Sequence, residues 1–192
     1  MHGILAEAQQ LHGRRHHARC RGVHESAQHC IARRAKCAAF VAEVSLLLNH
    51  DEPLDHQLQR CTDAAVQQLG AAFTRIWLLK PGDLCSSCYK ASWCRDRTLC
   101  LHLHASSGLS TNLNGEYRRV PLGALKIGRI AQGEGALLSN DVLSDDRLPN
   151  KAWMKEHELR SFAGFPLVVE GQVFGVLGLF SRHTISEPMR QA

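Results

Sequence analysis

The closing segment FAGFPLVVEGQVFGVLGLF, residues 162–180, restricts the fold of this chain more than any other stretch. Glu170-Gly171 separates two apolar arms, a pattern that predicts a β-hairpin with a two-residue turn. The second arm is apolar on both faces, which is typical of a central strand that is covered on both sides. We therefore expect a sheet with a layer of structure on each of its faces.

The rest of the chain supplies helices and strands for those layers. The segments with helical spacing or helix-capping residues are 38–48, 54–69, 123–135 and 150–157. The segments with the composition or alternation of strands are 71–80, 99–108 and 136–142. Gly70 is expected to end the second helix, because glycine readily adopts the left-handed conformation that closes helices. This order of elements predicts an α+β domain built on an antiparallel sheet.

Four cysteines fall within sixteen residues in CSSCYKASWCRDRTLC, at Cys85, Cys88, Cys94 and Cys100. The first three lie on an excursion, residues 81–98, and ordering so long a loop costs on the order of 1 kcal/mol per residue. Four thiolates can close a tetrahedral zinc site, which would hold the excursion in shape. We favour zinc, with an iron–sulfur cluster as the alternative. A thiol–disulfide switch and unliganded thiols stay open.

The first segment of the chain is basic. Residues 1–37 contain seven Lys or Arg, two Glu and six His, and they hold the whole net charge of +5. We expect a leader that is disordered or loosely helical. Because it lacks interleaved aromatic residues, nucleic acid is not expected as a partner. No stretch of about 18 apolar residues and no signal peptide is evident, so a cytoplasmic protein without a membrane partner is predicted.

Two long segments resemble the corresponding parts of a GAF domain, a small-molecule-sensing module related to PAS domains. They are VPLGALKIGRIAQGEGALLSNDVLSDDRL (residues 120–148) and SFAGFPLVVEGQVFGVLGLFS (residues 161–181). The resemblance covers residues 40–183, about three quarters of the chain. It implies a GAF/PAS-like, six-stranded antiparallel sheet with flanking helices and a ligand pocket on one side. Such domains occur in bacterial signal-transduction proteins of the sensor histidine kinase type, although the four-cysteine insertion is not a general feature of the family.

The resemblance also implies domain boundaries and partners. Residues 38–186 are expected to form the GAF domain, and residues 187–192 the start of a truncated C-terminal helix. Such helices usually lead into an output domain, for example a histidine kinase, which this chain would then lack. A homodimer through the flanking helices is expected as well. The chain is accordingly predicted to be a sensor and not an enzyme, because its sequence shows no nucleophile–base constellation.

The implied ligand pocket would lie among the segments around the two short helices. Its candidate residues are Arg129, Asn140, Asp141, Trp153 and Phe162. Each also has an ordinary structural role, such as a turn cap or a core aromatic residue, and no ligand can be named. An alternative function is a thiol-based enzyme resembling free methionine-(R)-sulfoxide reductase, a stand-alone GAF protein that uses reactive cysteines. The clustering of the cysteines on one excursion argues against that alternative.

Overall fold

The computed structural model describes residues 27–47, 49, 51–94 and 97–185. Its six strands form one antiparallel sheet in the order β3-β2-β1-β6-β5-β4. The strands are β1 (Phe73–Pro81), β2 (Leu99–Gly108), β3 (Arg119–Pro121), β4 (Leu137–Ser139), β5 (Ser161–Val169) and β6 (Gln172–Ser181). The predicted α+β class and the six-stranded antiparallel sheet are thereby confirmed.

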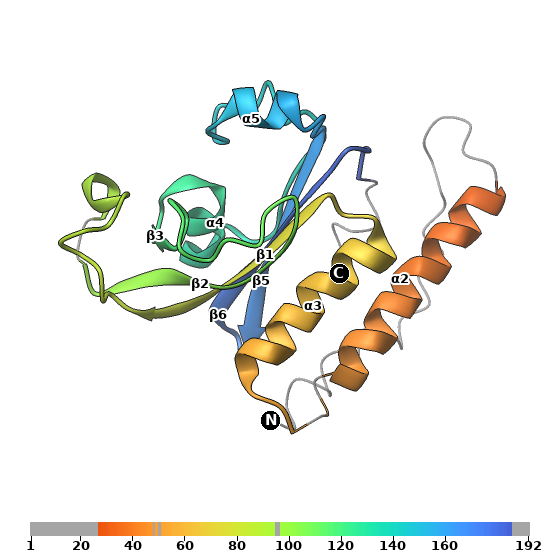
Figure 1. Cartoon of the computed structure of the whole chain (residues 1–192), viewed down its shortest axis with the longest axis horizontal. Coiled ribbons are helices and arrows are strands. Elements are labelled where there is room, and N and C mark those ends of the chain that lie inside the picture. The colour runs from red at the N-terminus through yellow and green to blue at the C-terminus, as the bar shows by residue number, and fades with distance from the viewer. Residues whose placement is uncertain (1–26, 48, 50, 95–96, 186–192) are drawn as a thin grey trace.

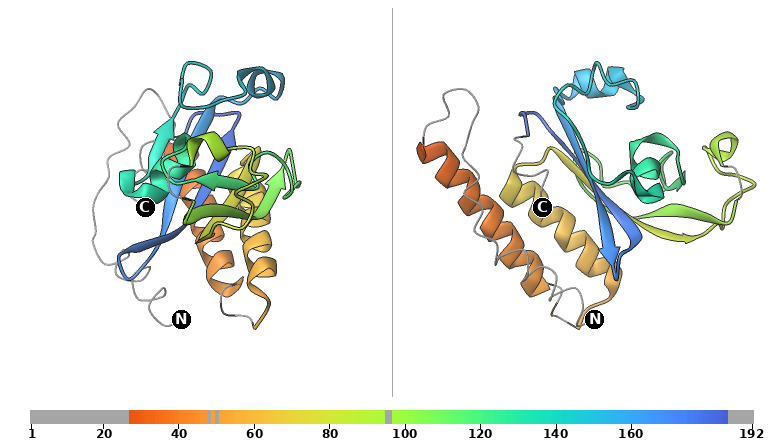
Figure 2. Two further views of the ribbon diagram at one scale, coloured as in Figure 1. Left: turned by 90° about the vertical axis from the view of Figure 1, so that its left-hand side faces the viewer. Right: turned by 180° about the vertical axis from the view of Figure 1, so that it is seen from behind.

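Helices lie on both sides of the sheet (Figure 1). The long helices α2 (Ala27–Leu47) and α3 (Leu54–Leu69) share one side, with α3 next to the sheet and α2 on the outer side of α3, as the turned views also show (Figure 2). The opposite side carries the short helical elements α4 (Leu125–Arg129), η2 (Ile130–Glu134) and α5 (Lys151–Glu156). Within the described ranges, no helix is long and apolar enough to cross a membrane.

Helix α3 confirms the prediction for residues 54–69. It ends at the expected glycine, because Gly70 adopts a left-handed conformation with a φ angle of 67°. Its apolar side faces the sheet, where Leu58 packs in one cluster with Ile76 and Leu78 of β1. The apolar side of this amphipathic helix is therefore the side that packs against the sheet.

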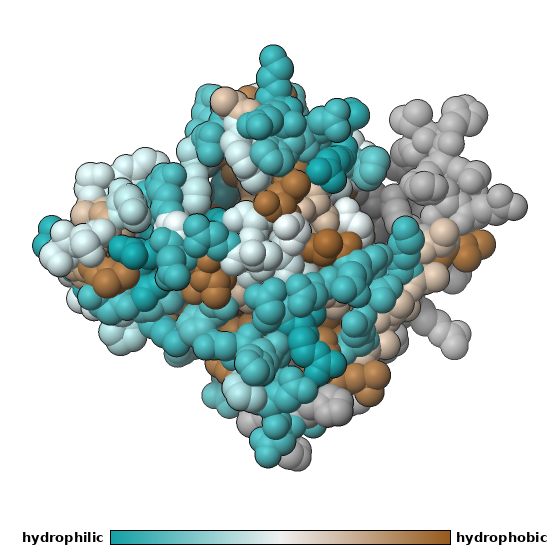
Figure 3. Space-filling model, viewed as in Figure 1, coloured by the Kyte–Doolittle hydropathy of each residue, from teal (hydrophilic) through white to brown (hydrophobic). Residues whose placement is uncertain are grey.

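Helix α2 runs across residue 37, the predicted end of the leader. Residues 1–26 and 187–192 lie outside the described residues, so the leader and the C-terminal helix stay predictions. The face of the molecule seen in Figure 3 is largely hydrophilic, whereas apolar residues gather along α2 at the right-hand edge. The outer helix thus combines a solvent-facing position with an apolar composition.

The closing hairpin forms as the pattern predicts. Strands β5 and β6 pair antiparallel, and both turn residues have positive φ angles, 50° at Glu170 and 77° at Gly171. A two-residue hairpin turn favours this conformation because its twist matches that of the flanking strands. Strand β6 lies between β1 and β5, and its side chains Val176 and Leu179 are buried. The prediction of a central strand is confirmed.

The sequence pattern does not predict β3. This strand has three residues, Arg119–Pro121, which pair with the first part of β2 at the edge of the sheet. Three residues ending in proline show no alternation that would mark them as a strand. The pairing depends on the neighbouring strand, since Val120 lies opposite Leu101 and both side chains are fully buried.

Candidate functional site

A cavity of about 270 Å³ lies on the side of the sheet opposite α2 and α3. Strands β1, β5 and β6 form its floor, and its walls come from α4, the segment between β2 and β3, and the segment that leads into α5. Its aromatic lining residues are Phe73, Trp77, Tyr117, Trp153, Phe162 and Phe180. Aromatic walls of this kind favour a ligand with an apolar or planar body.

Strand β1 places three residues in the cavity by its alternation. Phe73, Arg75 and Trp77 all line the cavity. The residues of opposite parity, Ile76 and Leu78, pack against α3 instead. One strand therefore contacts both the cavity and the helix layer.

The floor of the cavity is open where β6 has a glycine. Gly178 pairs with Arg75 across the β1–β6 ladder. A Cβ atom at Gly178 would lie 3.3 Å from Cζ3 of Trp77 and 3.6 Å from Cε2 of Phe162. A side chain at this position, even a methyl group, would therefore occupy space that now belongs to the cavity.

Arg75 brings a positive charge into the aromatic lining. Its guanidinium carbon lies 4.5 Å from the ring centroid of Phe73, and its Nε donates a hydrogen bond of 3.1 Å to Oγ of Ser106. Burial lowers the pKa of Arg75 to about 10, so the side chain is cationic at neutral pH. Among the described residues no carboxylate forms an ion pair with Arg75. Its terminal amino groups are therefore suited to an anionic group on a ligand.

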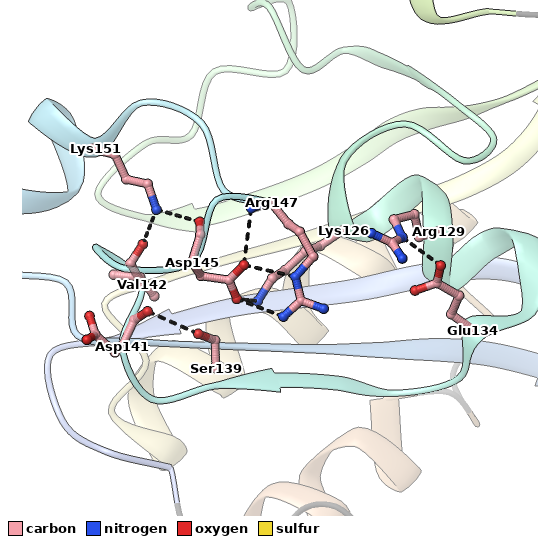
Figure 4. Close-up of polar contacts among 9 residues, drawn as sticks. All are labelled: Lys126, Arg129, Glu134, Ser139, Asp141, Val142, Asp145, Arg147 and Lys151. Carbon is pink, nitrogen blue, oxygen red and sulfur yellow. Dashed lines mark hydrogen bonds and ion pairs between the residues drawn. The ribbon is translucent and has the colours of Figure 1, made fainter.

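A second cation, Lys126, is buried at the other wall (Figure 4). It is 1% exposed, and its Nζ lies 2.5 Å from Oδ2 of Asp145 and 5.0 Å from the ring centroid of Phe162. Burial lowers the pKa of Lys126, and the nearby carboxylate of Asp145 partly offsets this effect. Hydrogen bonds from Arg147 and then from Lys126 hold the pKa of Asp145 far below its usual range. Lys126 and Arg147 thus share the ionised carboxylate of Asp145.

The rim of the cavity is linked to the cysteine excursion. Lys90 of the excursion is 9% exposed and forms an ion pair with Glu116. Its Nζ lies 4.9 Å from the ring centroid of Tyr117, whose carbonyl accepts a hydrogen bond of 3.0 Å from Nε1 of Trp77. Glu116 and Tyr117 both line the cavity. One lysine of the excursion therefore contacts two residues of the cavity lining.

The structure separates the five predicted pocket residues into two groups. Trp153 and Phe162 line the cavity. Arg129, in contrast, binds Glu134 at 2.6 Å (Figure 4). Asp141 accepts a hydrogen bond of 2.7 Å from Oγ of Ser144.

The remaining candidate, Asn140, also has a structural role, because it bonds the backbone of Ile185 with both its amide nitrogen and its amide oxygen. The reasoning from sequence missed Arg75 and Lys126. The signal for Arg75 was present, because an arginine that alternates with Phe73 and Trp77 on a strand must share their face.

The three cysteines of the excursion and Cys100 of β2 line a second, smaller cavity beside the first part of β2. Cys85, Cys88, Cys94 and Cys100 are all free thiols. Burial raises the pKa of Cys100 to about 11, so this thiol is protonated at neutral pH. In the part of the chain that the structure describes, no three His, Cys, Asp or Glu side chains are arranged to hold a metal ion. The predicted metal site is therefore not preformed.

The six-stranded sheet, with long helices on one side and a cavity on the other, defines the architecture of the GAF class of domains. The chain belongs to the GAF domain family, whose model matches residues 51–189. The resemblance seen in the sequence is confirmed at the level of the family. No protein with a curated description matches the chain in sequence.

Solved structures support the same architecture. The GAF domain of nlh2 from A. aeolicus, in an inactive state, superimposes with a TM-score of 0.60 at 17% identity, over 81% of this chain and 84% of that one. The GAF domain of a phosphoenolpyruvate-protein phosphotransferase from Coxiella burnetii has a TM-score of 0.59 at 15% identity, over 82% and 85% of the two chains. At these identities the likeness shows the fold alone.

The prediction that the chain is not an enzyme is wrong, because enzymes occur among the solved structures that share its fold. Similar structures include free methionine-R-sulfoxide reductase from Neisseria meningitidis in complex with its substrate, with a TM-score of 0.59 at 16% identity, over 89% of this chain and 86% of that one. Reductases from Thermoplasma acidophilum and Staphylococcus aureus, at 14% and 12% identity, are similar as well. The architecture of this chain is therefore shared by GAF domains of other proteins and by enzymes.

Proposed function

We propose that this chain is a sensory GAF domain that binds a small organic anion with an apolar or aromatic body in the cavity. The observation that supports this most strongly is the position of Arg75, a half-buried cation that lines the cavity and has no carboxylate partner among the described residues. Charge-assisted hydrogen bonds to such a guanidinium are strong and directional. The ring of the ligand would contact the aromatic walls, and its anionic group would pair with Arg75.

Lys126 and Arg147 have a different role in this proposal. Both line the cavity, but both are already bound to Asp145. They make one wall of the cavity more positive, but neither is free to form an ion pair with a ligand. We therefore propose that they attract the anion toward the cavity without binding it directly. Glu116 at the rim disfavours a second negative charge there. A ligand with one anionic end fits this distribution best.

The sensory part of the proposal rests on strand β1. A ligand that moved Arg75 or Trp77 would displace the strand whose other face packs on α3. The helix layer would then respond to occupation of the cavity, and an output domain such as a histidine kinase, in a bacterial signal-transduction protein, would read that response. This finer assignment agrees with GAF domains of known signalling and phosphotransferase proteins, from which it is taken by analogy.

The first experiment uses the three tryptophans as reporters. Trp77 and Trp153 line the cavity, whereas Trp93 lies on the cysteine excursion and is 51% exposed. Their indole N–H signals in two-dimensional NMR spectra would be followed during titration with benzoate. Benzamide, which has the same shape without the charge, is the matched probe.

We expect benzoate to shift the signals of Trp77 and Trp153 and to leave that of Trp93 in place. Benzamide should bind more weakly. Replacement of Arg75 by Gln should weaken benzoate binding by about tenfold, the effect of one charge-assisted hydrogen bond. Arg129→Gln is the matched control, since Arg129 lies outside the cavity and should bind as the parent chain does. Equal binding of benzoate by both variants, or shifts confined to Trp93, would contradict the proposal.

The reductase alternative has its own test. None of the described residues that line the aromatic cavity is a cysteine, so a thiol-dependent reaction would have to use the excursion. Incubation with free methionine sulfoxide and a dithiol reductant, followed by detection of methionine, measures the activity directly. Product that disappears with Cys85→Ser but persists with Cys61→Ser would assign the reaction to the excursion.

A further inference from the structure

We infer that Cys85, Cys88, Cys94 and Cys100 bind a metal centre through four thiolates. The chemistry is that of a soft metal, either zinc or an iron–sulfur cluster, both of which take four cysteine ligands. The inference rests on where the structure brings these side chains, on what else surrounds them and on what the excursion lacks.

The four side chains gather at one place although they are spread over sixteen residues. All four line the same small cavity, and Cys100 anchors it to the sheet as a buried residue of β2. The other two cysteines with described surroundings, Cys37 and Cys61, lie on the long helices. Convergence is therefore confined to the excursion and the strand that follows it.

The described residues of the excursion form no apolar core that could explain its shape. Its aromatic residues Tyr89 and Trp93 are 65% and 51% exposed. Among the same described residues, regular structure between β1 and β2 is limited to the short helical turn η1 (Ala91–Trp93). Loops of this length are ordered at a large entropic cost, and small units without a core are commonly stabilised by a metal or by disulfides. A metal centre bound by the cysteines would supply that cross-link.

The surroundings of the sulfurs contain a backbone donor and two arginines. The backbone N–H of Lys90 donates to Sγ of Cys88 at 3.4 Å, the kind of contact that orients a metal-bound sulfur. Arg97 and Arg119 line the cavity, and Arg119 is already bound by the carboxylate of Asp83. Four thiolates around a divalent ion leave a net negative charge, part of which Arg97 would offset.

Binding would draw the sulfurs together, since they do not form a closed ligand set as they stand. Each thiol would lose its proton to solvent and donate an electron pair to the metal, and no oxidant or reductant is required for a zinc ion. Only the excursion has to tighten, because Cys100 is held by the β2–β3 ladder opposite Pro121. The movement is thus local to the part of the excursion that carries Cys85, Cys88 and Cys94.

The test is the metal content of the full chain purified without oxygen or chelator. About one zinc per chain with no colour identifies a zinc ion, and iron with inorganic sulfide and visible absorption identifies a cluster. Either result supports the inferred metal site and shows whether it holds a zinc ion or an iron–sulfur cluster. A chain with neither metal, which also fails to take up added zinc after reduction of its thiols, overturns the inference.

Variants locate the centre. Cys85→Ser combined with Cys88→Ser should lose the metal, whereas Cys37→Ser and Cys61→Ser, the matched controls, should keep it. The NMR signals of Trp77 and Trp153 report whether each variant is folded. A second measurement uses the parent chain alone: bound metal should protect the four thiols from a thiol reagent, and a chelator should expose them. Unchanged thiol reactivity after chelation contradicts the inference even if the double variant fails to fold.

Discussion

Lys126 and Asp145 show at the scale of single residues how strongly a buried charge depends on its partner. The lysine is almost completely buried, and the ionised Asp145 lies beside its Nζ. A buried ammonium without a counter-charge is far less stable than the same group in water. The cavity wall therefore depends on a carboxylate that does not itself line the cavity.

Replacement of Asp145 by Asn should lower the free energy of unfolding by about 3 kcal/mol, because Lys126 then remains buried without a negative partner. Urea unfolding at neutral pH measures the difference. Asp146→Asn is the matched control, since Asp146 is the exposed neighbour in the chain. Adding Lys126→Met to Asp145→Asn should recover part of the loss, and a double variant as unstable as a sum of two independent losses would contradict this account.

The pH dependence of the same pair has a definite sign. The pKa of Asp145 is depressed in the folded state, chiefly by Arg147 and then by Lys126, so the carboxylate stabilises the fold above its unfolded pKa of about 4. That contribution is lost as the pH falls below this value. The stability gap between the parent chain and Asp145→Asn should be constant near neutral pH and should narrow in acid.

Residue-scale predictions from sequence succeed for side chains whose surroundings are local. The left-handed Gly70 and the turn Glu170-Gly171 depend on neighbours in the chain, and both were predicted. Lys126 is different, because its burial depends on Asp145, nineteen residues later, and no local pattern reveals that contact. Arg129 has an equally basic side chain on the same helix but binds Glu134 at the surface.

The pairing of β1 with β6 is the structural element on which the cavity rests. Two glycines of β6 approach β1 closely and differ in what they meet. A Cβ atom at Gly175 would lie 2.5 Å from the carbonyl oxygen of Trp77, whereas one at Gly178 would meet first the ring of Trp77 at 3.3 Å. Backbone cannot move without disturbing the ladder, but a side chain beside a cavity can adjust.

We expect Gly175→Ala to destabilise the fold by about 2 kcal/mol and Gly178→Ala by less than about 1 kcal/mol. Thermal unfolding followed by circular dichroism compares the two variants, each of which adds one methyl group to the same strand. The second variant should also weaken binding of benzoate, because the methyl group enters the cavity floor. Equal losses of stability would show that the contact with the backbone oxygen is not limiting.

Whether a helix or strand can be predicted from the sequence depends on how many residues it contains. The closing hairpin and α3 extend over many residues, and their periods are unmistakable. Strand β3 has three residues and exists because β2 offers it a partner, so its signal lies in the pairing and not in its own composition. The cysteine excursion was recognised as a unit, yet its contact with the cavity rim through Lys90 joins residues of two segments and could not be read from either.

The whole molecule presents an apolar surface on its outer helix. Ile31, Val41 and Leu46 of α2 are 67%, 51% and 66% exposed. Large exposed apolar residues that recur along one helix mark an interaction surface more often than isolated ones do. We propose that α2 pairs with α2 of a second copy, which is the homodimer expected from the flanking helices.

Val41→Glu combined with Leu46→Glu should convert the dimer into a monomer. The new carboxylates would be buried between the two helices without a positive partner. Analytical ultracentrifugation across a range of protein concentrations measures the change. Leu143→Glu, at an exposed leucine outside the helices, is the matched control and should leave the oligomeric state unchanged. A parent chain that sediments as a monomer at all concentrations would refute the proposal.

Lys90 connects the two cavities, since its backbone N–H donates to Sγ of Cys88 at the thiol site and its ammonium pairs with Glu116 at the aromatic cavity. Suppose that occupation of the thiol site shifts Lys90 and thereby changes the ligand affinity of the aromatic site by some factor. Thermodynamic linkage then requires that occupation of the aromatic site changes the metal affinity of the thiol site by the same factor. In a domain built in this way, the response to one input would depend on whether the other input is already present.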